Sequence, residues 1–416
     1  MLLFFDLFLV KIMKKLFLFL YMALVSALQG WGQFVYQPGA VDLSITRQGE
    51  SEFASGFSVF SLEGHFVWCG SAIQSKEDGR YYLFYSAMEA GLEYPKFVDA
   101  WLLGSKIGVA VSDSPYGGYK NLGFVYNKDG YRSDRISWDS QTVSNTHVKW
   151  FAGKYYLYYC GSVDPGEDAR IKGELSLRDR IQQNQKLGVI CFNSVEELLE
   201  GKYCCNEQPL LIPRTRVKGN NILEPSEEGV CAKPDNIIMV NPSVVYRPYD
   251  KKYLLFFKGN VYEPSWRGVH GVAIADYPCG PFTVMDNPVF EYKAKDNRKL
   301  NAEDPYVWYS GKDKKFYAVF KDFTGSFTQG EPGLAIMYSK DGIKWELPEQ
   351  SLFMRKEILL KSGERIRVDR LERPQLLLDN NEDPIVLYSA CSIIPVNMKR
   401  DGSSFNIQIP IMKKKN

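Results

Sequence analysis

A fivefold internal repeat is the feature that most restricts what this 416-residue chain can fold into. Each copy has a short leading segment, an apolar stretch, a polar turn and a second stretch rich in aromatic residues. The leading segments are CGSAI at 69, SNTHV at 144, VNPSV at 240, EDPYV at 303 and ERPQL at 372, and the aromatic stretches run from RYYLFYS at 80 to PIVLYSA at 384. Repeated supersecondary units are typical of repeat architectures. We therefore expect five β-hairpins.

A third apolar stretch follows each hairpin, for example LGVICFNS from 187, and the fifth copy is FNIQIP at 405–410. Blades stacked around an axis bury both faces of each sheet, which explains why these stretches are almost continuously apolar. The sequence therefore predicts an all-β fold, a five-bladed β-propeller with four-stranded blades and a central funnel. Two β-sandwiches or a jelly roll would also give many short strands, but neither explains five aligned leading segments.

The N-terminal segment has the pattern of a signal peptide. Lys14 and Lys15 precede an apolar run from 16 to 28, which is shorter than the roughly 20 residues of a membrane span. We expect residues 1–32 to be removed, with Met13 as an alternative start, and the protein to be periplasmic or secreted, with no membrane span left. An uncleaved anchor is the alternative. Residues 33–416 would then form one propeller domain with a long insertion at about 163–234, which either shapes a substrate mouth or is a surface loop.

The overall charge excludes some ligand classes. The chain has 51 basic and 49 acidic residues, so it has no field to attract nucleic acid or an anionic membrane. The motifs G-x-S-x-G and H-E-x-x-H and phosphate loops are absent. We expect an oligosaccharide partner and no cofactor or metal, although a single structural Ca²⁺ at the axis would be compatible with such a fold.

Three carboxylates are the candidate catalytic groups, because the innermost strands of a propeller converge on its axis. Glu303, Asp304 and Glu372 lie in the leading segments of the fourth and fifth copies. Glycoside cleavage requires a proton donor and a second carboxylate. In a regular strand only one of the neighbours Glu303 and Asp304 can face the funnel, but a bulge would expose both. The alternatives are a structural carboxylate at 303 or 304 and an ion pair between Glu372 and Arg373.

The candidate substrate-binding residues lie beside these carboxylates or at the hairpin ends. Aligned on the proline of the last three copies, the preceding position reads Gly70, Asn145, Asn241, Asp304 and Arg373. A guanidinium at 373 is suited to binding a carboxylate or sulfate. Charges at hairpin ends can also just mark strand ends, and tryptophans near a funnel can be packing residues. The candidates are Asn145, Asn241, Arg373, Asp139, Lys321, Asp322 and Trp68.

Five segments of the chain carry a family resemblance: WCGSAIQSKEDGRYYLFYS, AEDPYVWY, KDFTG, LERPQL and SSFNIQIP. Over about residues 50–412 the chain resembles the superfamily of glycoside hydrolase families 32, 43, 62, 68, 117 and 130. It is most similar to exported propeller proteins of polysaccharide-degrading bacteria, with some likeness to family 117. The resemblance implies that a glutamate donates the proton, either Glu303 or Glu372. The usual first-blade aspartate base is missing, so Asp139 or Asp304 would have to serve, or the mechanism differs.

These observations predict an exo-acting glycosidase that cleaves an oligosaccharide with Glu303 and Glu372 as its paired carboxylates. Two alternatives stay open. A propeller that binds carbohydrate without cleaving it would explain the missing first-blade aspartate. A phosphorylase similar to family 130 would require phosphate and several basic residues in the funnel.

Overall fold

The computed structural model describes residues 35–127, 137–205, 207–263, 265–293, 299, 301–328, 330 and 332–414. The expected signal peptide, residues 1–32, lies outside them and stays a prediction. The main compact unit is Pro38–Ile411, and a small second unit consists of the segments before and after it. No described helix has the length and apolar character needed to cross a bilayer.

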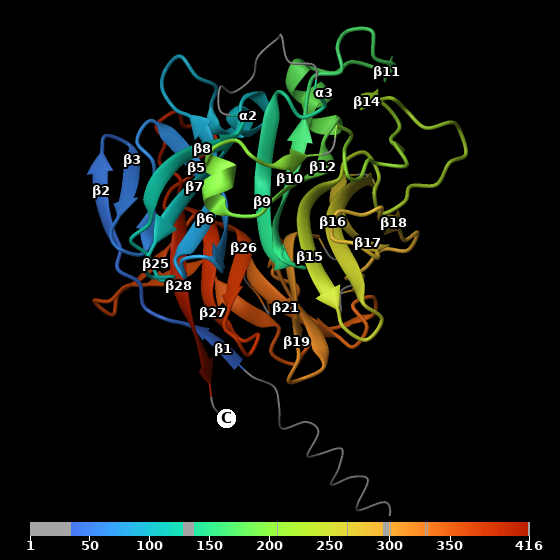
Figure 1. Cartoon of the computed structure of the whole chain (residues 1–416). Coiled ribbons are helices and arrows are strands. Elements are labelled where there is room, and N and C mark those ends of the chain that lie inside the picture. Colours follow the sequence, from blue (N-terminus) through green and yellow to red (C-terminus); the bar gives the residue numbers. More distant parts are fainter. Residues whose placement is uncertain are drawn as a thin grey trace, which may run out of the picture. The chain divides into compact units, whose positions relative to one another are not determined.

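The main unit is a five-bladed β-propeller, as predicted (Figure 1). Each blade is an antiparallel sheet whose first three strands are the three repeated stretches of the sequence. The blades are β5 (His65–Gln74), β6 (Tyr81–Glu89), β7 (Lys106–Ser112) and β8 (Lys120–Tyr126); β9 (Thr142–Phe151), β10 (Lys154–Ser162), β12 (Lys186–Phe192) and β13 (Cys204–Cys205); β15 (Val240–Arg247), β16 (Lys252–Tyr262), β17 (Trp266–Ala275) and β18 (Thr283–Val284); β19 (Ala302–Ser310), β20 (Lys315–Asp322), β21 (Gly333–Ser339), β22 (Trp345–Glu346) and β23 (Leu352–Arg355); and β26 (Arg370–Leu378), β27 (Pro384–Ser392) and β28 (Phe405–Lys414).

The innermost strands form a closed ring around the axis. Each of β5, β9, β15, β19 and β26 contacts the next, and β26 contacts β5 again. A strand from the start of the chain completes the fifth blade, because β4 (Val59–Phe60) pairs with β28 through Phe60 opposite Asn406 and Val59 opposite Ile407. Full closure of this kind is how antiparallel folds remove exposed strand edges.

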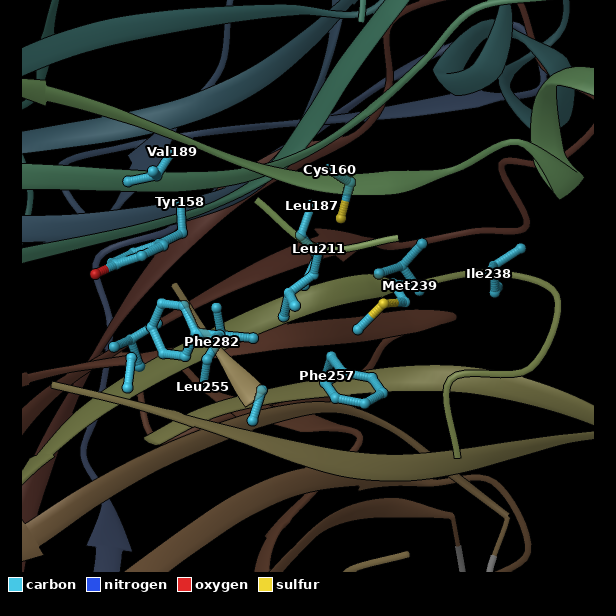
Figure 2. Packing of buried hydrophobic residues seen from close by; sticks show 14 of the residues in the cluster. Tyr158, Cys160, Leu187, Val189, Leu211, Ile238, Met239, Leu255, Phe257 and Phe282 are labelled. Atoms are coloured by element: carbon cyan, nitrogen blue, oxygen red, sulfur yellow. The ribbon is translucent and has the colours of Figure 1, made fainter. Parts of the chain in front are cut away.

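Buried hydrophobic clusters lie between neighbouring blades. Figure 2 shows the cluster between the second and third blades, where Tyr158 and Leu187 face Leu255 and Phe257. Both faces of these sheets are therefore buried, which accounts for the continuous apolar stretches in the sequence.

Aromatic residues on the second strands pack over very small residues on the third strands. Tyr85 is paired with Gly108, Tyr159 with Gly188 and Phe257 with Gly271. In the fourth blade the partner of Phe320 is Ala335. The rings cover the space that a larger side chain on the third strand would occupy. In the fifth blade the sizes are reversed, with Ser389 opposite Ile407.

Short elements decorate the loops. The helix α2 (Phe97–Leu103) lies between β6 and β7 in the sequence. Along the chain, α3 (Leu177–Gln183) precedes β12 and α4 (Val195–Leu199) follows it. Within the predicted insertion, α3 begins after Ser176, whose hydroxyl accepts a hydrogen bond from the Asp179 amide. The remaining strands are β1 (Val35–Pro38), the pair β2 (Ser44–Gln48) and β3 (Ser51–Ser55), the pair β11 (Ile171–Lys172) and β14 (Ile222–Leu223), and the pair β24 (Glu357–Leu359) and β25 (Arg365–Arg367).

The ring-over-glycine packing gives a stability prediction. A Cβ added at Gly271 would lie 2.2 Å from Cζ of the fully buried Phe257. We expect Gly271→Ala to lower the free energy of unfolding by about 1–3 kcal/mol, because overpacking forces the ring and backbone apart. Gly219→Ala is the matched control, because no atom lies within 4 Å of its added Cβ. Urea unfolding would measure both, and equal stability of the two variants would contradict the prediction.

Candidate active site

A β-bulge interrupts each inner strand at the same place. In β19, for example, Glu303 pairs with Lys321 and regular pairing resumes only at Tyr306 opposite Val319. The first residue of the interruption adopts a left-handed backbone conformation in all five strands. The φ angles are 52° at Cys69, 58° at Asn145, 59° at Asn241, 60° at Asp304 and 53° at Arg373. Residues held in this sparsely populated region cluster at functional sites.

This register corrects the alignment of the first copy by one residue. Trp68 pairs with Ser86 and regular pairing resumes at Ser71, so Cys69 occupies the position of Asn145 and Asp304. Gly70 instead takes the place that proline has in the last three copies. The first copy has neither the asparagine of the second and third copies nor the proline of the last three, and the alignment therefore slipped by one residue. Trp68 thus corresponds to Glu303 and Glu372.

The bulge directs both Glu303 and Asp304 toward one cavity. In a regular strand only one of the two neighbours could face it. This axial cavity has a volume of about 260 Å³. Glu372 and Arg373 of the next blade line it as well, and so do Asn145 and Asn241. The structure therefore brings the three predicted carboxylates together from adjacent blades.

The five left-handed residues are joined by hydrogen bonds around the axis. The Cys69 thiol donates to Asn145 Oδ1 over 2.8 Å. Asn145 Nδ2 donates to Asn241 Oδ1, and Asn241 Nδ2 donates to Asp304 Oδ1, each over 2.6 Å. The Arg373 amide donates to Asp304 Oδ2 over 3.1 Å, and its Nη2 donates to the Asn145 carbonyl over 3.0 Å. The polar atoms predicted to bind sugar are thus largely committed to one another.

A second row of polar groups alternates in charge across the cavity. Lys258 is hydrogen-bonded to Glu303, and the Lys321 ammonium lies 3.7 Å from Glu303 Oε2 and 2.6 Å from Glu372 Oε1. Arg370 Nη1 then donates to Glu372 Oε1 over 3.0 Å. Buried charges require such partners. The predicted Lys321 is therefore part of the site through both glutamates.

The surroundings move the pKa values of the neighbours Glu303 and Asp304 in opposite directions. Burial would raise the pKa of Glu303, but the ammonium groups of Lys258 and Lys321 outweigh it and lower this pKa to about 2. Burial and the Glu303 charge raise the pKa of Asp304 to about 6, against the opposing effect of Arg373. Carboxyl groups whose pKa values are pushed apart are typical of acid/base sites.

One side of the cavity is aromatic. Trp68 lines it together with Phe97 and Trp101 of α2. The rings of Trp68 and Phe97 meet edge to face, with centroids 4.8 Å apart. Trp68 therefore packs against a neighbour and also presents part of its surface to the cavity.

Several lining residues were not identified from the sequence. Gln182 and Gln185 come from the insertion at 163–234, so part of this insertion does shape the cavity. Arg370 could have been found, because it precedes Glu372 by two residues and residues at that spacing share a strand face. Asn260 and Asn397 also line the cavity, and neither had a distinguishing signal in the sequence.

Three predicted binding residues do not line the cavity: Lys321 contacts the two glutamates without lining it, and Asp139 and Asp322 lie away from it. Asp139 is buried, and its Oδ2 accepts hydrogen bonds from Tyr126 and Tyr159 over 2.7 and 2.6 Å. Asp322 is also buried, and its carboxylate accepts hydrogen bonds from Thr324 and from the Phe327 amide in the following loop. Both carboxylates stabilise local structure. The sequence alone does not reveal this role for a polar residue beside a strand end. Among the residues described, no cluster of three or more His, Cys, Asp or Glu side chains is arranged to hold a metal ion.

Comparisons with known proteins agree with this architecture. No protein-family model and no curated protein matches the sequence. Among solved structures, a complex of BT0996 with RGII superposes with a TM-score of 0.56 at 11% identity, covering 86% of this chain and 91% of the other. Zg3597, a family 117 glycoside hydrolase of Zobellia galactanivorans, gives 0.53 at 15% identity, with 91% and 90% covered. The catalytic domain of a family 62 α-L-arabinofuranosidase of Coprinopsis cinerea gives 0.50 at 11% identity, with 92% and 97% covered.

At these identities the likeness establishes the fold. The chain is a five-bladed β-propeller of the kind found in glycoside hydrolases, including families 62 and 117. The fold implied by the sequence resemblance is therefore confirmed.

The low pKa of Glu303 gives a prediction for acid stability. Its ionised carboxylate stabilises the folded state above pH 4.5, and this contribution is lost as the pH falls from 4.5 toward about 2. We expect the free energy of unfolding of Glu303→Gln to depend less on pH over that interval than that of the wild type. Urea unfolding at several pH values tests this, with the exposed Glu63→Gln as the control. An unchanged slope in Glu303→Gln would show that the carboxylate is not held by the two lysines.

Proposed function

We propose that this protein is an exo-acting glycoside hydrolase that cleaves an oligosaccharide in the axial cavity. The observation that carries the proposal is the pair of carboxylates, Glu303 and Glu372, which face one cavity from adjacent blades. Hydrolysis of a glycoside by an oxocarbenium-like transition state needs two such groups.

In this proposal the two glutamates have different tasks. Lys258 and Lys321 keep the pKa of Glu303 low, so Glu303 is the carboxylate that attacks the sugar carbon. Glu372 takes up a proton from solvent when its hydrogen bonds to Lys321 and Arg370 open as the sugar enters, and it gives this proton to the leaving oxygen. In the second step it accepts a proton from the water that hydrolyses the glycosyl-enzyme. Asp304 orients Arg373 and the axial amides through its hydrogen bonds.

The spacing of the pair favours retention of anomeric configuration. Lys321 Nζ lies 3.7 Å from one Glu303 oxygen and 2.6 Å from one Glu372 oxygen, so these oxygens are separated by at most the sum of the two distances. The separations that this limit allows include the roughly 5–5.5 Å between the carboxyl groups of retaining enzymes. A double displacement through a glycosyl-enzyme on Glu303 fits this space.

The substrate class proposed is an arabinose-containing oligosaccharide. The solved structures that share the fold include the BT0996 complex with RGII and an arabinofuranosidase. The aromatic wall of Trp68, Phe97 and Trp101 bounds the cavity on one side, which supports removal of a terminal sugar. Export through the signal peptide at 1–32 would bring the enzyme to such a substrate outside the cytoplasm.

We expect a screen of the protein lacking residues 1–32 to detect release of a monosaccharide without added phosphate. Arabino-oligosaccharides and oligosaccharides from RGII would be the first substrates, followed by NMR of the product anomer. A product of retained configuration is expected. Inversion would remove Glu303 from the nucleophile role, and release that requires phosphate would indicate a phosphorylase.

The roles of the two glutamates are separable with an activated substrate. We expect Glu303→Gln to lose at least about 10³-fold in kcat on every substrate. Glu372→Gln should lose activity on oligosaccharides but keep much more of it on a 2,4-dinitrophenyl glycoside, whose leaving group needs no proton. Steady-state rates on both substrate types measure this. Equal losses on both substrates for Glu372→Gln would exclude it as the proton donor.

A carbohydrate-binding propeller without catalysis is the second candidate. It is favoured by the inner positions of the first three blades, where Trp68, Ser144 and Val240 stand in place of a carboxylate. Saturable oligosaccharide binding with no product after prolonged incubation would identify it.

A further inference from the structure

A second cavity opens directly beside the axial cavity. Its volume is about 420 Å³, and the two share five lining residues. We call it the outer groove, and its own lining includes Lys218, Asn221, Trp266, Asn301 and Phe323. The shared residues are Gln182, Ile238, Lys258, Asn260 and Glu303.

The position of Glu303 in both linings relates the groove to the reaction centre. A molecule that occupies both cavities passes over this carboxylate. The aromatic wall of Trp68, Phe97 and Trp101 belongs only to the axial cavity. An oligosaccharide whose terminal sugar fills the axial cavity therefore has the outer groove as its continuation.

Aromatic faces are presented along this groove. The side chains of Trp266 and Phe323 are 44% and 37% exposed, which is unusual for large apolar residues that have a core available. Trp266 is held in place on two sides. The Tyr262 ring meets it edge to face at 5.5 Å, and the Lys218 ammonium lies 4.6 Å from its ring centroid. Lys218 is itself fixed by donating to the Asn221 carbonyl over 3.0 Å.

Most of the remaining lining is polar and of mixed charge, beside the apolar residues Leu175, Ile237 and Ile238. Gln182, Asn260 and Asn301 supply amides that can both donate and accept hydrogen bonds. The acidic groups Glu174, Asp179 and Glu303 accompany the basic groups Lys218 and Lys258. The groove therefore has no excess of positive charge for a polyanion. Flat apolar faces beside neutral amides suit sugar rings, which have apolar faces and polar edges.

We infer that the outer groove binds the second and following units of a neutral oligosaccharide, with Trp266 as the stacking platform. This inference rests on the proposed function for its direction, because it takes the axial cavity as the place of the terminal sugar. It identifies the substrate as a chain of several units. The insertion at 163–234, which supplies Gln182 and Lys218, then determines the accepted chain length.

The test is binding as a function of chain length. Arabino-oligosaccharides from disaccharide to hexasaccharide would be titrated calorimetrically into Glu372→Gln protein, with oligogalacturonides of the same lengths as the anionic comparison. Affinity should rise with length for the neutral series. In this background, Trp266→Ala should weaken binding of the longer chains by about tenfold, as expected for a truncated aromatic anchor, and affect the disaccharide least.

Three further variants separate stacking from folding. Trp266→Phe should restore most of the length dependence, because it keeps an aromatic face, and Phe323→Ala should weaken the longer chains as Trp266→Ala does. Tyr277→Ala is the matched control, because Tyr277 is 66% exposed and lines neither cavity. Thermal unfolding checks that all four variants are folded.

The outcomes distinguish this inference from the proposed function. Affinity that does not change with length, preference for the anionic series, or full length dependence in Trp266→Ala would overturn the groove assignment while hydrolysis by the wild type could stand. If Trp266→Ala abolishes the length dependence of binding and the wild type releases no sugar, the assignment of the groove is supported. The proposal that the protein is a hydrolase is then overturned.

Discussion

The site depends on the chain of hydrogen bonds that joins Cys69, Asn145, Asn241, Asp304 and Arg373 around the axis. Each of these residues has a left-handed backbone, which costs about 1–2 kcal/mol for a residue other than glycine. Asparagine and aspartate tolerate this conformation best, and three of the five positions have them. The side-chain amides of Asn145 and Asn241 each accept a hydrogen bond from one neighbour and donate one to the next. The five strained bulges therefore stabilise one another.

The bulges also explain why so many charges share one cavity. A regular strand would place Glu303 and Asp304 on opposite faces, whereas the bulge directs both inward. Two lysines of the second strands, Lys258 in β16 and Lys321 in β20, then form ion pairs with the glutamates and neutralise them. Any ligand that contacts the glutamates in the cavity must compete with these ion pairs. Its binding would therefore be coupled to rearrangement of Lys321, which contacts both glutamates.

Much of the fold could be predicted from the sequence, because hairpins and apolar third strands recur five times. The clustering of Glu303, Asp304 and Glu372 followed from the same repeat. The register of the first copy could not be predicted, since Trp68 and Cys69 carry no proline to align on. Asp139 and Asp322 looked available for binding, but hydrogen bonds from distant tyrosines and from a following loop hold them in the interior. Residues that reach the cavity from α2 and α3 depend on loop paths, which no repeat specifies.

The pairing of β4 with β28 has a consequence for the order of assembly. The ring closes when Asn406 and Ile407 pair with Phe60 and Val59. Residues synthesised early therefore find their partners only after the C-terminal strand has been synthesised. Glu372 and its partner Arg370 belong to this last blade. A growing chain can form the first four hairpins in sequence, but its cavity lacks one of the two glutamates until the fifth blade docks. The axial cavity is thus among the last parts of the molecule to be completed during synthesis, and premature termination within the fifth blade leaves an open ring.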